Sequence, residues 1–301
     1  MNIGFVGLGV MGNPMALNLI RSGDYRVRVY DIDTARAQNL VDQGAELSAS
    51  IADVVADADV VMTSLPGPKQ IEAVGLAENG IVNHLRSGAV WIDLSTNNLD
   101  CAAAIRQATA ARDIDILDAP VSGGDEGARA GKLTVLVGGR HAVFKRYQTL
   151  LEVIGEQIIW LGAHGAGYSA KIAQVVLCYL HSLALSESLM LGIKGGVDPE
   201  KMLSIIQNST GQSYVANRYG PPVLVGDYDP SFTVGLAHKD LWLAREMADN
   251  LGIRLPMCEL TTETYARAVA EFGFDANHLK AVRLLEQDNN TFLQIQSGDK
   301  V

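Results

Sequence analysis

The first half of the chain alternates short apolar runs with segments whose apolar residues recur at helical spacing. Runs of Val, Ile and Leu are typical of buried strands, and the longer segments between them favour amphipathic helices. This alternation predicts an α/β domain in which helices cover a doubly wound parallel sheet. The predicted strands are residues 3–6, 26–30, 60–64, 90–94, 116–118, 133–137 and 158–161.

Helix-end signals support this interpretation of the first half. Gly23 follows a predicted helix at 14–21, and Gly44 follows another at 34–43, for which Asp33 is the expected N-cap. Asp is a favoured N-cap because its carboxylate accepts a bond from a free backbone N–H, and Gly readily adopts the left-handed conformation that ends a helix.

After Gly162 the alternation stops, and the second half is predicted to be all-helical. A proline-free segment rich in Ala, Leu, Ile and Ser runs from 165 to 194; as one helix it would be about 45 Å long at 1.5 Å per residue. Asp198 and Pro199 are the expected N-cap and first position of the next helix. Further helices are predicted at 234–250, 256–272 and 278–287, with no strand among them.

Length and composition are consistent with two globular domains. The chain has 301 residues, of which 48% are hydrophobic and 19% charged, and single cores usually stop growing near this size. We therefore predict an α/β domain over 1–163 and a helical domain over 164–290, joined by the long helix. Residues 291–301 are predicted to form a frayed tail.

Charge and cysteine content narrow the class of protein. A formal net charge of −10 argues against a nucleic-acid partner, because such affinity is built mainly from Lys and Arg. Cys101, Cys178 and Cys258 are far apart in the sequence, which indicates neither a disulfide framework nor a zinc site, and no other metal site is predicted. Polar residues interrupt the apolar stretches, and the N-terminus does not resemble a signal peptide. We expect a soluble, cytoplasmic protein that does not bind membranes.

A glycine-rich loop joins the first predicted strand to the first helix. Gly7, Gly9 and Gly12 follow the pattern G-x-G-x-x-G, in which the glycines allow a tight turn, close approach of a pyrophosphate, and helix packing on the strand. The pattern alone is weak evidence, and an ordinary glycine-rich turn is the simpler alternative. Here a second strand follows and ends at Asp31, at the distance expected for a dinucleotide-binding site.

Asp31 also indicates which dinucleotide is bound. A carboxylate at this position accepts hydrogen bonds from the ribose hydroxyls of NAD and repels the 2′-phosphate of NADP, so NAD is the predicted cofactor. Arg36 lies one short turn further along the chain, and its side chain has the length and charge to reach a phosphate. The sequence leaves the direction of Arg36 open.

Four segments together resemble the β-hydroxyacid dehydrogenase family, which includes 3-hydroxyisobutyrate dehydrogenase and tartronate semialdehyde reductase. They are the loop and helix start at 7–16, Asp-Ala-Pro-Val-Ser-Gly-Gly at 118–124, Gly-Ala-Gly-Tyr-Ser-Ala-Lys at 165–171, and His-Lys-Asp-Leu at 238–241. The resemblance covers nearly the whole chain. It implies a Rossmann domain followed by a helical domain, with the active site between them, in a homodimer or homotetramer.

The resemblance implies that Lys171 is the catalytic general acid/base. In the family this lysine takes the hydroxyl proton as hydride leaves the substrate carbon for the nicotinamide. Free lysine titrates near pH 10.4, so the role requires a lowered pKa, to which burial and the positive charge of oxidised nicotinamide both contribute. A lysine on a helix is more often a surface residue, and the motif match is what favours catalysis here.

Ser122, Gly123 and Gly124 are the expected binding site for a substrate carboxylate. They follow a predicted strand end, where ligands gather in open α/β sheets. Backbone N–H groups of a glycine turn form an anion nest, and the serine hydroxyl adds a donor. A flexible loop is the simpler alternative.

The remaining site residues are carried over from the family. Tyr214 and Tyr219 are expected in the substrate pocket, although aromatics at such spacing often belong to a core. Asp240 is expected to hold the substrate or the lysine region. The expected cofactor contacts beyond the glycines and Asp31 are Leu8, Val10, Met11, Leu65, Pro66, Thr96 and Lys239.

One departure from the family pattern concerns the substrate. Family members usually carry an Asn three or four residues after the lysine, where this chain has Gln174 and Val175. Gln174 is the position that can supply the amide, so it is a predicted substrate contact, with a solvated helix-face glutamine as the alternative. The presence of Lys171 argues against the related imine reductases, which lack it.

The sequence therefore predicts an NAD-dependent oxidoreductase that interconverts a small 3-hydroxy carboxylate and its semialdehyde or keto acid. A reductase of the tartronate semialdehyde type, working in the opposite direction, is the alternative enzyme. A catalytically silent dinucleotide-binding module is the alternative from another class, against which Lys171, Ser122 and the acidic charge argue.

Overall fold

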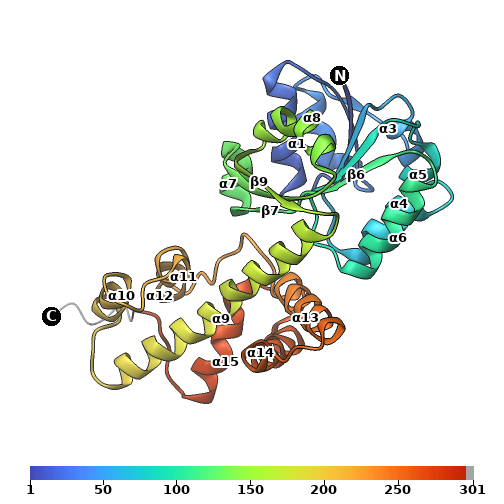
Figure 1. Cartoon of the computed structure of the whole chain (residues 1–301). Coiled ribbons are helices and arrows are strands. Elements are labelled where there is room, and N and C mark those ends of the chain that lie inside the picture. The colour runs from blue at the N-terminus through green and yellow to red at the C-terminus, as the bar shows by residue number, and fades with distance from the viewer. Residues whose placement is uncertain (296–301) are drawn as a thin grey trace. The chain divides into compact units, whose positions relative to one another are not determined.

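A computed structural model describes residues 1–295 of the chain (Figure 1). It divides into two compact units, Met1–Lys171 and a second that begins at Ile172. The division falls inside one helix, α9 (Ala166–Lys194), which is continuous through it. The domain limits inferred from the sequence, 1–163 and 164–290, stay a prediction. Of the predicted tail, residues 296–301 lie outside the described part.

The described part of the first unit is built on one mixed sheet of nine strands in the order β3-β2-β1-β4-β5-β6-β8, with β7 and β9 both paired to β8. Strands β1 to β6 pair in parallel, as the alternation predicts. The strands are β1 (Asn2–Val6), β2 (Arg26–Tyr30), β3 (Glu46–Leu47), β4 (Val60–Thr63), β5 (Val90–Asp93), β6 (Asp115–Asp118), β7 (Val121–Ser122), β8 (Leu133–Gly139) and β9 (Gly155–Gly162).

The doubly wound, mainly parallel sheet is confirmed, with one departure at β8, which runs antiparallel to β6 and β7. The chain leaves β6, passes Pro120 and continues as β7, so that both strands line one edge of β8 while β9 lines the other in parallel. Strands β3 and β7 were also missed, because two residues are too few to show a strand period.

Helices cover both faces of this sheet, and alternate residues of its central strands enter two separate cores. Val60 and Met62 of β4 pack with the core under α1 and α8, whereas Val61 packs with the core under α3 to α6. Such continuous burial is expected for strands covered on both faces. The helices are α1 (Gly12–Ser22), α2 (Gln38–Val41), α3 (Ile51–Val55), α4 (Pro68–Leu76), α5 (Ile81–His84), α6 (Leu99–Ala110), α7 (Gly124–Ala130) and α8 (His141–Glu152).

Most residues predicted to cap helices do so in the structure. Gly23 ends α1 in the left-handed conformation, and the Asp33 side chain accepts a bond from the Ala35 N–H. The segment 34–43 is not one α-helix, however. It begins as a 3-10 helix (Thr34–Ala37) and becomes α-helical only over α2.

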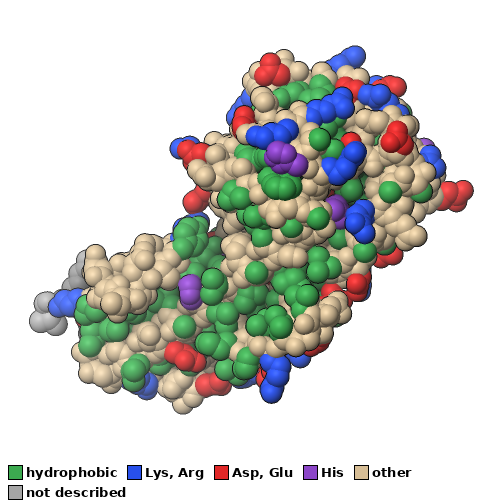
Figure 2. Space-filling model, in the orientation of Figure 1, with side chains coloured by type: hydrophobic (Ala, Val, Ile, Leu, Met, Phe, Trp, Pro, Cys, Tyr) green, Lys and Arg blue, Asp and Glu red, His purple; other side chains and the backbone are tan. Residues whose placement is uncertain are grey.

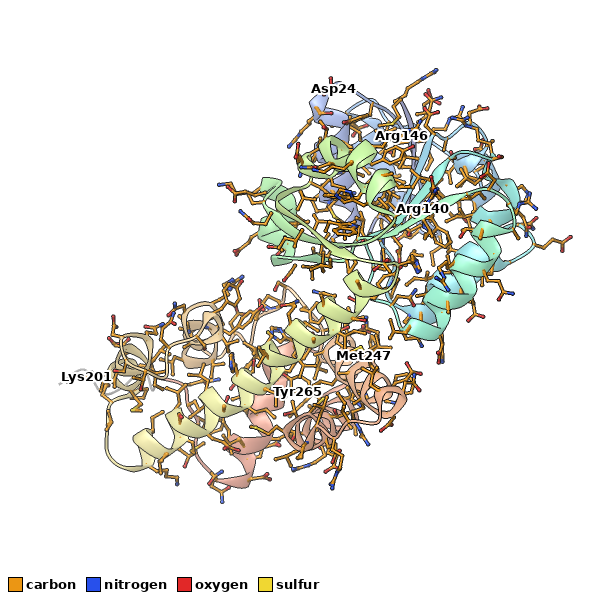
Figure 3. The ribbon with its side chains drawn as sticks, viewed as in Figure 1. Asp24, Arg140, Arg146, Lys201, Met247 and Tyr265 are labelled. Carbon is orange, nitrogen blue, oxygen red and sulfur yellow. The ribbon has the colours of Figure 1, made fainter. Side chains whose placement is uncertain are left out.

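The second unit is helical, and two hydrophobic clusters line α9. Ile172 and Val176 join α13, α14 and α15 in one cluster, where Tyr265 lies (Figure 3), and Leu189 joins the shorter helices in the other. The sequence did not indicate α11 and α12, which have only five residues each. The helices are α10 (Pro199–Gln207), α11 (Tyr214–Arg218), α12 (Gly220–Leu224), α13 (Val234–Leu251), α14 (Pro256–Phe272) and α15 (Ala281–Asp288), the last preceded by a 3-10 turn (His278–Lys280).

By length and composition alone, α9 could cross a membrane, contrary to the expectation that polar residues interrupt every apolar stretch too early. A core helix of a globular protein passes the same test. The hydrophobic residues of α9 are spread around its circumference, as expected for a helix that packs on several sides. Among its polar residues, Tyr168, Tyr179 and Ser186 form buried hydrogen bonds.

Candidate active site

The glycine loop between β1 and α1 has the geometry that the sequence pattern predicts. Gly7 has a φ of +93°, and its N–H bonds the Tyr30 carbonyl at 3.0 Å. A Cβ there would lie 2.3 Å from the Ser64 carbonyl oxygen, and a Cβ on Gly12 would lie 1.9 Å from that of Gly7. The two positions therefore exclude any side chain.

Gly9 differs from Gly7 and Gly12 because the space beside it is open. A Cβ built there would meet only an Arg36 nitrogen, at 3.8 Å, among the atoms of residues 1–295. Within that described range, no side chain caps the start of α1. An open approach to Gly9 beside an uncapped helix N-terminus fits a dinucleotide pyrophosphate, which takes its hydrogen bonds from such N–H groups.

Asp31, at the end of β2, is buried and holds the glycine loop in place. Its carboxylate accepts the Leu8 N–H at 2.6 Å and the Asp33 N–H at 2.9 Å. Each carboxylate oxygen has a second lone pair for a ribose hydroxyl. Arg36, whose direction the sequence left open, pairs with Asp33 at 3.2 Å and lies beside Gly9.

Asp93 ends β5, is fully buried and accepts four hydrogen bonds. Thr63 and Ser95 donate hydroxyls at 2.6 Å each, the Ser95 N–H donates at 3.2 Å, and the Tyr168 hydroxyl donates at 2.6 Å. Burial raises the pKa of Asp93, and these hydrogen bonds oppose the rise. The Ser95 hydroxyl also accepts the N–H of Leu65, a predicted cofactor neighbour.

Asp118 ends the adjacent strand β6, directly beside Asp93 in the sheet register. Its buried carboxylate accepts three backbone N–H groups at the start of α9, from Gly165 at 2.9 Å, Gly167 at 2.7 Å and Tyr168 at 3.2 Å. His164 Nε2 lies 3.8 Å from the same carboxylate, and burial lowers the pKa of that imidazole. Two carboxylates thus occupy the carboxyl edge of the sheet, where open α/β sheets bind ligands.

The predicted substrate loop begins four residues after Asp118. Gly123 and Gly124 have φ values of +134° and +66°, a conformation that side chains rarely adopt, and the space beside Gly124 is open in the described structure. Ser122 ends β7, immediately before them. The loop therefore has the backbone freedom that an anion nest requires, and its role in binding substrate stays a prediction.

Lys171 lies in the second turn of α9, three residues beyond Tyr168, and is partly buried. Gln174 lies three residues further along and is exposed. Residues three apart on a helix face the same side, so the register assumed for these two residues is confirmed. Their chemical roles stay predictions.

In the second unit, Lys239 and Asp240 of α13 form an ion pair at 2.9 Å. Asp240 is buried and also accepts the Tyr179 hydroxyl of α9 at 2.8 Å. Burial raises the pKa of Tyr179 well above its usual value, so the phenol stays a donor.

The predicted pocket residues Tyr214 and Tyr219 lie together, with ring centroids 6.0 Å apart and nearly perpendicular. Tyr214 is exposed and Tyr219 only partly so. The Tyr219 ring also contacts His278 at 4.9 Å, and the His278 imidazole lies 3.3 Å from the Asp229 carboxylate. One tyrosine is thus accessible to a ligand while the other also contacts the interior.

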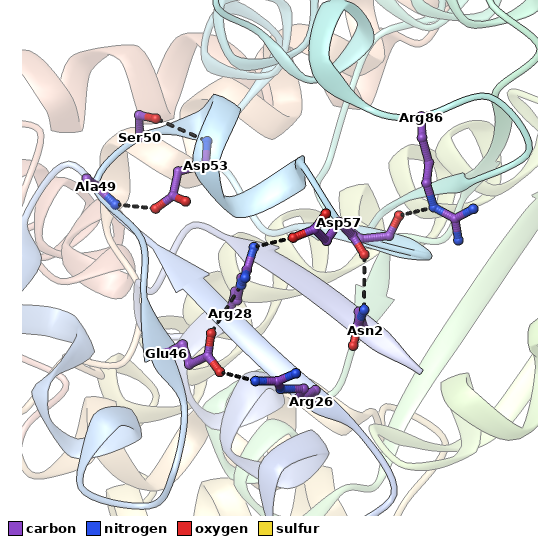
Figure 4. Close-up of polar contacts among 10 residues, drawn as sticks. Asn2, Arg26, Arg28, Glu46, Ala49, Ser50, Asp53, Asp57 and Arg86 are labelled. Carbon is purple, nitrogen blue, oxygen red and sulfur yellow. Dashed lines mark hydrogen bonds and ion pairs between the residues drawn. The ribbon is translucent and has the colours of Figure 1, made fainter.

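A second polar cluster lies at the amino ends of the strands (Figure 4), next to a pocket of about 360 Å³. Glu46 bridges Arg26 and Arg28, Arg28 also reaches Asp57, and Arg86 pairs with Asp59. The two arginines of β2 lower the pKa of Glu46. Each of these guanidinium groups already has a carboxylate partner. The cluster is therefore better suited to stabilising the amino ends of the strands than to binding an anion.

Sequence reasoning assigned no role to Asp93, Asp118, Tyr168 or Tyr179. Asp118 and Tyr168 were within recognised motifs, and Asp93 ends a predicted strand at the edge where ligands bind. An acidic residue at such a strand end could have indicated a role for Asp93 and Asp118. No local pattern indicated a role for Tyr179, because its partner Asp240 is 61 residues away.

Two family models together match most of the chain: the NAD binding domain of 6-phosphogluconate dehydrogenase over residues 2–162, and the NAD-binding domain of NADP-dependent 3-hydroxyisobutyrate dehydrogenase over 165–285. Among curated proteins, the chain is 38% identical to 2-(hydroxymethyl)glutarate dehydrogenase of Eubacterium barkeri, over 87% of each chain. It is 33% identical to 2-hydroxy-3-oxopropionate reductase of Escherichia coli K12, over 95% of this chain and 97% of that one.

Among solved structures, a 3-hydroxyisobutyrate dehydrogenase of Mycobacterium tuberculosis, described with L-serine, superposes with a TM-score of 0.85. The two are 29% identical, and the match covers 94% of this chain and 98% of that one. With its glycine loop, strand-end carboxylates and helical second unit, this chain belongs to the β-hydroxyacid dehydrogenase family, NAD(P)-dependent oxidoreductases that transfer hydride to and from small hydroxy acids.

Proposed function

We propose that this enzyme interconverts a small 3-hydroxy carboxylate and its semialdehyde or keto acid with NAD(H), and that Lys171 is its general acid/base. The observation that carries the proposal is the position of Asp118. Its main chain leads into the Ser122–Gly124 loop, and its carboxylate holds the α9 turn that precedes Lys171. Asp118 is thus connected both to the loop proposed to bind the substrate carboxylate and to the helix turn that precedes Lys171.

Each group of the site has a defined task in this mechanism. Bound NAD supplies the hydride acceptor, and Gly7, Gly9, Gly12 and the start of α1 would hold its pyrophosphate, with Asp31 at the ribose. Ser122 and the N–H groups of the following glycines bind the substrate carboxylate. The Lys171 amine takes the hydroxyl proton during oxidation and returns it to the carbonyl oxygen during reduction.

NAD is the proposed cofactor in preference to NADP. Asp31 would place a negative charge beside the 2′-phosphate of NADP, and Arg36, the nearest cation to Gly9, already pairs with Asp33. Steady-state kinetics with both cofactors provide the test. Equal or better efficiency with NADPH would show that Arg36 overrides the carboxylate.

A substrate panel tests the reaction itself. We expect NAD-dependent oxidation of at least one of 3-hydroxyisobutyrate, 2-(hydroxymethyl)glutarate and L-serine, or NADH-dependent reduction of tartronate semialdehyde. Gln174, in place of the usual Asn, argues for a substrate other than 3-hydroxyisobutyrate. Absence of turnover on the whole panel, with intact NADH binding, would favour a silent dinucleotide-binding module instead.

A homodimer or homotetramer is the proposed assembly. Large exposed hydrophobic side chains are more frequent on the helical unit than on the first unit. Figure 2 draws the hydrophobic side chains of one face in green. Apolar surface of this kind is typical of subunit interfaces. Light scattering after size-exclusion chromatography measures the mass, and a monomer at micromolar concentration would contradict the proposal.

A reducing, cytoplasmic location is consistent with the cysteines. All three are free, and Cys101 and Cys258 are buried. Burial raises the pKa of the Cys101 thiol to about 11, which keeps it in the unreactive thiol form. Thiol titration after denaturation of the protein purified without reductant checks this, with three free thiols expected.

A further inference from the structure

The first turn of α9 is held by a buried charge. The four N–H groups at the start of any helix lack partners within the helix. Asp118 accepts three backbone N–H groups at this end, and its carboxylate is inaccessible to solvent. Hydrogen bonds to a charged acceptor are about twice as strong as neutral ones, and negative charge at a helix N-terminus is stabilising.

A second carboxylate holds the side chain of the same turn. Asp93 is the sheet neighbour of Asp118, and it accepts the Tyr168 hydroxyl at 2.6 Å. Its three bonds from Thr63 and Ser95 keep the Asp93 carboxylate in one orientation. The backbone of the turn is therefore bound to β6, and its tyrosine is bound to β5.

A third restraint comes from Gly167. A Cβ at this position would lie 2.2 Å from the Leu136 carbonyl oxygen of β8 and 2.8 Å from an Asp118 carboxylate oxygen. The helix backbone thus lies directly against the sheet, at a separation that only glycine allows. Contacts to β5, β6 and β8 together fix both the position and the rotation of this turn.

Lys171 lies three residues beyond Tyr168 and four beyond Gly167, which places it on the same helix face one turn later. At 1.5 Å per residue its Cα is only about 5 Å along the axis from the anchored turn. If that turn were displaced, the backbone at Lys171 would therefore move by nearly the same distance.

We propose that Asp118 and the Tyr168–Asp93 hydrogen bond are positioning groups that fix the Lys171 amine at the carboxyl edge of the sheet. The proposal rests on the proposed role of Lys171 in proton transfer. A misplacement of about 1 Å can cost on the order of 100-fold in rate, so positioning has a kinetic effect distinct from stability. If Asp118 and Asp93 only stabilise the fold, their loss lowers stability without acting through Lys171.

A double-mutant cycle tests this distinction. Tyr168→Phe is made in the wild-type and in the Lys171→Ala enzyme, and kcat, NADH affinity and unfolding are measured for each. We expect Tyr168→Phe to lower kcat about tenfold in the wild type and to have less than a twofold effect once Lys171 is absent. NADH affinity should stay unchanged in all variants.

The matched control is Tyr265→Phe, which removes a hydroxyl from another fully buried tyrosine, on α14 (Figure 3). Its kcat should stay within twofold of wild type. If Tyr168→Phe fails to fold, Asp118→Asn enters the same cycle. The amide keeps the shape, but its NH2 group cannot accept a backbone N–H, so at least one of the three hydrogen bonds is lost together with the charge.

Three results would overturn the proposal. An equal fall in kcat in both backgrounds means that Tyr168 acts independently of Lys171, and an unchanged kcat in wild type means that it does not act at all. In both cases the role of Lys171 is unaffected. A Lys171→Ala enzyme within a few-fold of wild type removes the proposed function, and the positioning role with it.

Discussion

Helix α9 donates one tyrosine hydroxyl to a buried aspartate in each unit, and the two aspartates are satisfied differently. Asp93 receives Tyr168 together with three bonds from Thr63 and Ser95, which are fixed on or beside strands. Asp240 receives Tyr179 and pairs with the flexible ammonium of Lys239. The first carboxylate therefore has four hydrogen-bond donors, and the second has one hydroxyl donor and one ammonium partner.

Backbone donors distinguish some of the buried carboxylates from others. In the first unit Asp118 accepts three backbone N–H groups, and Asp93 accepts one together with three side-chain hydroxyls. In the helical unit Asp240 is held by the side chains of Tyr179 and Lys239, whereas the buried Glu286 also accepts the backbone N–H of Leu293, at 2.8 Å. The contrast therefore separates individual carboxylates, according to whether a backbone N–H holds them.

The largest effect is expected where the two units divide, at Lys171. Lys171→Ala should lower kcat by about 10²- to 10⁴-fold, the usual range for loss of a general acid/base. NADH binding, followed by fluorescence, should stay near wild type because the lysine serves proton transfer. Activity within a few-fold of wild type would place the chemistry elsewhere.

Removal of the two tyrosine hydroxyls compares the two aspartates directly. Tyr179→Phe should destabilise the protein by about 1–3 kcal/mol, because the buried Asp240 then depends on Lys239. Tyr168→Phe should cost no more than about 1 kcal/mol, because Asp93 keeps three bonds. Urea unfolding measures both, with Tyr265→Phe as the control. Equal losses would contradict the difference that we draw between the two carboxylates.

Gln174 tests whether the helical unit sets the substrate. Gln174→Ala should reduce kcat/KM by about tenfold, equivalent to one lost hydrogen bond of roughly 1.4 kcal/mol. Gln174→Asn moves the amide about 1.5 Å closer to the backbone and should shift the preferred substrate toward 3-hydroxyisobutyrate. Unchanged kinetics in both variants would make Gln174 a solvated surface residue.

The smallest effect concerns pH and the helical unit. Burial lowers the pKa of His278 to about 4, although Asp229 opposes the shift. Between pH 6.5 and 4 the unfolded chain therefore binds a proton that the folded one does not, so stability is fully present above pH 6.5 and falls as the pH is lowered. The loss from pH 7 to 6 should be below about 1 kcal/mol.

The matched variant for this pH effect is His278→Asn, measured by urea unfolding at several pH values. Its stability should depend less on pH between 6.5 and 4 than that of wild type. Burial also lowers the pKa of His164 and His238, so part of the dependence should remain. A slope equal to that of wild type would show that His278 does not titrate as the structure implies.

Local patterns predicted much of the fold. Gly23, Asp33 and Asp198 end or begin helices as their residue types require, because capping depends on neighbours within a few residues. The glycine loop could be predicted for the same reason. The antiparallel direction of β8 could not be predicted in this way. It depends on pairing with β6 and β7, and the periodicity of hydrophobic residues says nothing about which strands pair.

The candidate site follows the same rule. Asp31 and the Ser122–Gly124 loop were identified because each lies next to a recognisable strand end. The partners of Asp118 at 165–168 are 47 to 50 residues away, and Tyr168 reaches Asp93 across 75 residues. Such contacts exist only once the sheet has brought its strand ends together.

The anchoring of α9 also has a consequence for synthesis on the ribosome. The first compact unit ends at Lys171, so the nascent chain completes it only when the first turn of α9 has left the exit tunnel. Until then the carboxylate of Asp118 lacks its three backbone donors and the turn that packs against it. A fragment that ends at residue 163 should therefore fold poorly, whereas one that continues past Lys171 carries the donors that it needs.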